Sequence, residues 1–170
     1  MKKTSILILF ILMANSNLIA QNDEISAFLL KWENSKNYLL EIAENMPEAN
    51  YNFKPTERQM SFKEQLLHIR QNMVWLSENY FMKEGEKSEK IEPKTKEEII
   101  THLSASFNSV SEIIKTISNK DLTLQVDFFA GPKSKLQILN LLQDHVTHHR
   151  GQLIVYLNLN SIQPPKYSGW

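Results

Sequence analysis

The sequence predicts an all-α fold, a four-helix bundle preceded by a cleavable N-terminal signal peptide. Four long segments carry apolar residues at helical spacing. The 170 residues include only 4 Gly and 6 Pro, which favours helices over a turn-rich β fold. The first 20 residues have the composition of an export signal. The length suits one domain, and a hydrophobic content of 42% is enough for a single core.

The N-terminal segment has three parts. Lys2 and Lys3 precede an apolar run at 6–14, and a more polar stretch follows that ends in Ala20. This order is typical of a secretory signal peptide, and the run is shorter than the ~20 residues that a membrane-spanning helix needs. We expect residues 1–20 to be removed, leaving a domain at 21–170 that is periplasmic or secreted and has no stable membrane anchor.

The four predicted helices follow in order, and their ends are marked by local chemistry. We expect them at about 23–45, 61–82, 95–118 and 134–159. Pro47 ends the first. Ser61 and Thr95 are each followed three residues later by a glutamate, the capping-box pattern that begins a helix. A polar linker at 83–94 and a connector at 119–133, with an extended stretch expected at 122–129, join the later helices.

Charge and cysteine content exclude several classes of protein. The 19 basic and 19 acidic residues balance and are interspersed, so no nucleic-acid partner is expected. The absence of cysteine excludes disulfides, thiolate metal ligands and a cysteine nucleophile.

The most informative feature is a group of histidines in the fourth predicted helix. His145 and His149 are four residues apart, so they project from one face of a helix and could share a metal ion. A helical wheel places this pair on the inward stripe and His148 at its flank; a His145/His148 pair is the less favoured alternative. A third ligand must come from another helix.

His68 in the second predicted helix is the candidate for that ligand. Gln65, Asn72 and Trp75 share its side of the helix, which suggests a polar cavity walled by Trp75 and reached by Gln152 from the fourth helix. The spacing alone also allows ordinary core or surface histidines, and His102 is interpreted in that way.

Four segments carry a resemblance to a known family. The segment 144–152 (DHVTHHRGQ) resembles the signature of the DinB-like (DinB/YfiT) superfamily of proposed metalloenzymes. Residues 46–55, 61–69 and 163–167 are similar to its link after the first helix, its second-helix histidine segment and its proline-rich tail. The resemblance covers about 23–167. It implies a four-helix bundle, often a homodimer, and a divalent metal ion, commonly zinc or nickel, held by His68, His145 and His149.

Such a site suggests a function but identifies no reaction. Three protein ligands leave coordination positions open, as in catalytic rather than structural sites. We expect a metal-dependent hydrolase or group transferase acting on an unidentified small molecule; some members of the superfamily are thiol-dependent transferases or isomerases. The alternatives are a non-catalytic bundle that binds a metal or small ligand, and a purely structural domain. Glu64 could act as a base near His68, although the capping role is favoured.

The signal peptide generates a first prediction. Protein recovered from the periplasm or medium should begin near Gln21, because a signal peptidase cuts after a small residue such as Ala20. Intact-mass spectrometry checks this. A soluble cytoplasmic pool that retains Met1 would contradict it.

Overall fold

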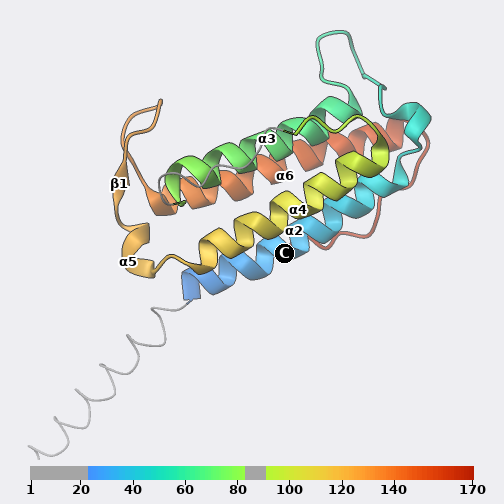
Figure 1. The fold of residues 1–170 in the computed structure, drawn as a ribbon. Coiled ribbons are helices and arrows are strands. Elements are labelled where there is room, and N and C mark those ends of the chain that lie inside the picture. The colour runs from blue at the N-terminus through green and yellow to red at the C-terminus, as the bar shows by residue number, and fades with distance from the viewer. Residues whose placement is uncertain (1–22, 83–90) are drawn as a thin grey trace, which may run out of the picture.

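The computed structural model describes residues 23–82 and 91–170, and the chain is mostly helical there (Figure 1). Four long helices lie side by side: α2 (Asp23–Asn45), α3 (Phe62–Tyr80), α4 (Lys96–Lys115) and α6 (Lys135–Leu159). Helix α2 packs against α4 and α6, and α3 packs against the same two helices. The predicted signal peptide and most of the linker at 83–94 lie outside the described residues.

The helix starts follow the capping chemistry in the sequence. Ser61 precedes α3, accepts a hydrogen bond from the backbone N–H of Glu64 and donates its own N–H to the Glu64 carboxylate at 2.6 Å. Thr95 and Glu98 form the same capping box at α4, and Ser134 and Gln137 form one at α6. Helix α2 spans the predicted 23–45, whereas α3 and α4 end two to three residues earlier than expected.

Short elements join the long helices and depart from a purely helical fold. A 3-10 turn, η1 (Glu48–Asn50), follows α2, and a one-turn helix, α5 (Asn119–Leu122), follows α4. Strands β1 (Gln125–Val126) and β2 (Lys133–Ser134) then pair antiparallel. Of the stretch expected to be extended at 122–129, only Gln125 and Val126 form a strand, because only these two residues pair with the returning strand. Gly131, with φ of 87°, adopts the left-handed conformation in the intervening turn.

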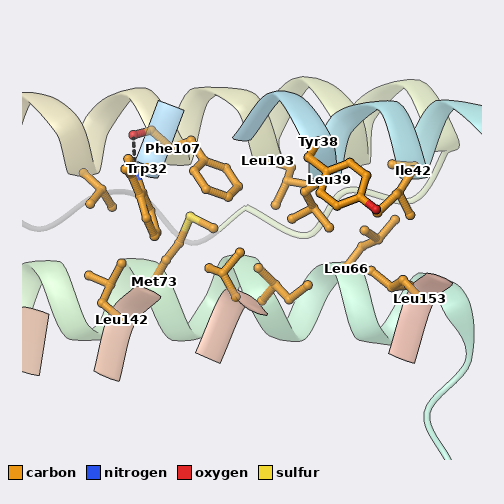
Figure 2. Close-up of a cluster of buried hydrophobic side chains, with 14 of the residues drawn as sticks. Trp32, Tyr38, Leu39, Ile42, Leu66, Met73, Leu103, Phe107, Leu142 and Leu153 are labelled. Carbon is orange, nitrogen blue, oxygen red and sulfur yellow. Dashed lines mark hydrogen bonds between the residues drawn. The ribbon is translucent and has the colours of Figure 1, made fainter. Parts of the chain in front are cut away.

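The core lies between the α2/α4 pair and the α3/α6 pair (Figure 2). Trp32 is fully buried, its indole N–H donates to the Phe107 carbonyl at 3.1 Å, and the two rings are 4.6 Å apart. Met73 and Leu142 approach from the opposite pair of helices. In residues 23–82 and 91–170, no helix is long and apolar enough to cross a membrane.

Trp32 should contribute strongly to stability. The Trp32→Phe substitution removes buried volume and the hydrogen bond to Phe107, so we expect a loss of about 1–3 kcal/mol in the free energy of unfolding. Urea denaturation measures it. Trp170→Phe is the matched control, because Trp170 is 69% exposed and such substitutions change stability by less than about 0.5 kcal/mol. Equal effects of the two substitutions would contradict this account of the core.

Candidate metal centre

Three histidines from two helices meet on the face where α3 packs against α6. Helices α3 and α6 run in opposite directions (Figure 1), which brings His68 of α3 beside His145 and His149 of α6. The Nε2 atoms of His68 and His145 are 3.1 Å apart. The His149 ring centroid lies 4.6 Å from that of His68 and 4.4 Å from that of His145. One nitrogen from each histidine lies within 4.8 Å of the other two, so the cluster could hold a metal ion.

The geometry and the donor chemistry both fit a divalent ion. Nitrogens bound to zinc at about 2.0–2.1 Å lie roughly 3–4 Å from one another. The His68–His145 separation falls in this range, and the whole set of three lies within the wider limit of 4.8 Å. No carboxylate belongs to the cluster among the residues that the structure describes. An all-imidazole set suits zinc, nickel and similar ions better than calcium or magnesium, which take oxygen ligands.

The electrostatic environment keeps the two α6 histidines neutral at ordinary pH. Burial, with smaller effects from His149, His68 and His148, lowers the pKa of His145 from 6.5 to about 4. Burial, followed by His68 and His148, likewise lowers the pKa of His149 to about 4. The neutral imidazole is the form that binds metal, so few protons have to be displaced near pH 7.

Hydrogen bonds determine which ring nitrogen of His149 is available. Its Nδ1 lies 2.6 Å from Oε1 of Gln65, one turn before His68 on α3. With Nδ1 engaged, Nε2 is the atom that can bind an ion. For His145, Nδ1 is buried without a hydrogen-bond partner among the described residues, and Nε2 faces His68.

The other candidate residues lie outside the histidine cluster. His148 is exposed, and its Nε2 lies 3.0 Å from the Gln152 amide nitrogen, so the His145/His149 pair is the one that faces α3. His102 lies on α4 and lines a different hollow, between α3 and α4. Hydrogen bonds from Ser61 lower the pKa of the Glu64 carboxyl, which serves as the helix cap.

The expected cavity is only partly matched. Gln152 reaches the histidines through the Gln65 side chain, at 2.6 Å. Trp75 is 40% exposed and packs against Phe128 and Phe129 of the connector rather than forming the wall of an enclosed cavity. Gln65 was predicted to lie on the same side of the helix as His68, but no function was assigned to it. Its position three residues before His68 was the feature that could have identified it.

Comparisons with known proteins agree with this fold. The model of the DinB family matches residues 13–168. The uncharacterized protein YjoA of Bacillus subtilis (strain 168) is 27% identical over 146 residues, which cover 82% of this chain and 90% of YjoA. The crystal structure of YjoA, described as DinB-like, aligns with a TM-score of 0.69 and 23% identity over 86% of this chain and 97% of that one. A DinB-like protein from Bacillus cereus aligns with a TM-score of 0.71 and 20% identity, covering 84% and 96%.

The lowered histidine pKa values predict a pH-dependent stability. Between the folded value of about 4 and the ordinary 6.5, the unfolded chain binds more protons than the folded one. Above pH 6.5 these two histidines therefore do not reduce the free energy of unfolding. Below pH 6.5 the free energy of unfolding decreases as the pH falls toward 4. Urea denaturation of the metal-free protein across this range should show the decline, and a His145→Asn/His149→Asn variant should show a smaller one. The same slope in both proteins would contradict the prediction.

Proposed function

The chain belongs to the DinB family, and we propose that it binds one divalent metal ion through His68, His145 and His149 and acts as a metal-dependent enzyme on a small molecule. The observation that carries the proposal is the convergence of three imidazoles from α3 and α6, with no carboxylate among them in the described part of the chain. Zinc and nickel are the ions that such donors suit best.

The residues of the chain would hold and expose such an ion. Three ligands leave coordination positions open, as catalytic sites require. His68 and His145 are only partly buried, so a substrate can approach from solvent, whereas His149 is 8% exposed and anchors the inner side. When bound, a divalent ion supplies Lewis-acid chemistry, which serves hydrolysis and group transfer alike. Hydrolase and group transferase are therefore the two reaction classes proposed.

A non-catalytic bundle that binds a metal or small ligand is the second candidate. One observation favours it: the carboxylate nearest in sequence to His68, that of Glu64, is engaged by Ser61 at the helix cap. A general base would then have to be a group other than the Glu64 carboxylate. Chelator-sensitive turnover distinguishes the enzyme from the binding protein.

The proposal also includes a location and an assembly. We propose export to the periplasm or the medium, supported by the basic, apolar and small-residue order of residues 1–20. A homodimer is proposed by analogy with other proteins of this superfamily. Size-exclusion chromatography with light scattering measures the assembly.

Metal content tests the proposal directly. The purified protein should carry close to one equivalent of zinc or nickel, and His145→Ala should lose it, because two remaining ligands hold an open site poorly. His102→Ala is the control, since His102 lies in the separate hollow on α4 and should leave the metal content unchanged. Inductively coupled plasma mass spectrometry gives the stoichiometry.

The outcomes separate the candidates. Equal metal content in the two variants would reject the histidine assignment. A substrate screen with and without chelator then follows on the metal-loaded protein: chelator-sensitive turnover supports the enzyme, and stoichiometric metal without turnover across hydrolase and transferase substrates supports the binding protein.

A further inference from the structure

Gln65 is a buried polar side chain at the centre of the contact between α3 and α6. It is 2% exposed, and its side chain contacts three residues of α6. Oε1 lies 2.6 Å from Nδ1 of His149, and Nε2 lies 2.6 Å from Oε1 of Gln152 and 3.4 Å from the Tyr156 hydroxyl. A buried amide that uses both its donor and its acceptor groups has a strongly restricted orientation.

The direction of each hydrogen bond follows from a backbone carbonyl outside the two helices. The Tyr156 hydroxyl lies 2.9 Å from the carbonyl oxygen of Met60, and a carbonyl can only accept, so the hydroxyl donates its single proton there. The phenol oxygen can then only accept a hydrogen bond from the Gln65 side chain. The amide nitrogen of Gln65 must therefore face Tyr156, which turns Oε1 toward His149.

The last step determines the protonation pattern of the histidine. Oε1 of Gln65 is an acceptor only, so Nδ1 of neutral His149 must carry the proton and donate it. Nε2 is then unprotonated, with its lone pair free. His145 has no comparable restraint, because its Nδ1 has no partner among the described residues.

We propose that Gln65 and Tyr156 are positioning residues that hold His149 in the Nδ1–H tautomer, so that Nε2 is prepared as a metal ligand before any ion arrives. Partners of this kind orient ligating histidines, and their loss weakens metal binding by about 10–100-fold. The metal-binding part of this inference rests on the proposed function; the tautomer part concerns the metal-free protein and does not.

Gln152 supports the same arrangement from the solvent side. It accepts the second N–H of Gln65, which leaves its own amide nitrogen to donate to Nε2 of the exposed His148 at 3.0 Å. His148 thus has a role as the outer end of the hydrogen-bonded chain and not as a ligand.

The test uses variants of matched size. Gln65→Met removes the acceptor while nearly preserving volume, and Gln65→Glu restores an acceptor at the same position. Tyr156→Phe removes only the hydroxyl. The control is Gln143→Met, because Gln143 is also buried on α6 but donates to Ser35 of α2 at 2.8 Å, on another face of the helix.

Two measurements are made on each protein. Two-bond ¹H–¹⁵N correlation spectra of the metal-free proteins at pH 7.5 give the tautomer of His149. Competition with a chromophoric chelator gives the zinc affinity. We expect the Nδ1–H tautomer in the wild type, Gln143→Met and Gln65→Glu, and a shift toward Nε2–H in Gln65→Met and Tyr156→Phe. Zinc affinity should fall about 10–100-fold in Gln65→Met and stay unchanged in Gln143→Met.

The results distinguish this inference from the proposed function. A Gln65→Met protein that keeps the Nδ1–H tautomer and wild-type zinc affinity overturns the inference. If Gln65→Met does not fold, Tyr156→Phe decides the tautomer question by itself. If the wild type binds no zinc or nickel but the tautomer shifts as expected, the proposed function fails while the positioning role stands.

Discussion

The packing of α3 against α6 is the contact on which the candidate site depends. Apolar side chains such as Leu66 and Leu153 bury one part of this contact, and a strip of polar side chains crosses another. Polar groups removed from water must find partners in the protein, because an unpaired one costs about 1–3 kcal/mol. His149 and Tyr156 of α6 meet this condition because each forms a hydrogen bond with Gln65 of α3. The same bonds that make the contact tolerable for polar residues also align the imidazoles.

In the histidine cluster, one ring is held by a hydrogen bond and another does not satisfy all of its hydrogen-bonding groups within the described part of the chain. Nδ1 of His149 is restrained by Gln65, whereas Nδ1 of His145 is buried without a hydrogen-bond partner among the described residues. His68 and His145 place two Nε2 atoms 3.1 Å apart. Only one of two neutral imidazoles so arranged can donate a proton to the other. Three imidazoles directed at one region would gain little from each other and more from a shared cation. This is a physical reason for regarding the cluster as a site and not as ordinary core packing.

Much of this arrangement could be predicted from the sequence, because local chemistry encodes it. Capping residues Ser61 and Thr95 located the starts of two helices, and four-residue spacing located the His145/His149 pair. The role of Gln65 could not be predicted, since it depends on the position of Met60 and Tyr156 in space. Of the β1–β2 hairpin, only an extended stretch containing β1 was expected. Strands of two residues have no periodicity, and their pairing exists only because the chain turns back at Gly131. Trp75 was expected on the His68 side of its helix, but its packing against Phe128 of the connector was not foreseen.

The separation of the histidines along the chain has a consequence for how long the protein survives. His68 and His145 are 77 positions apart, so an ion that binds both would link α3 to α6 and would bind the folded chain more tightly than the unfolded one. Under such linkage, free metal at a hundred times the dissociation constant adds about 2.7 kcal/mol to stability. The abundance of the protein would then follow the supply of metal in its compartment, and metal starvation would increase the unfolded fraction that proteases remove.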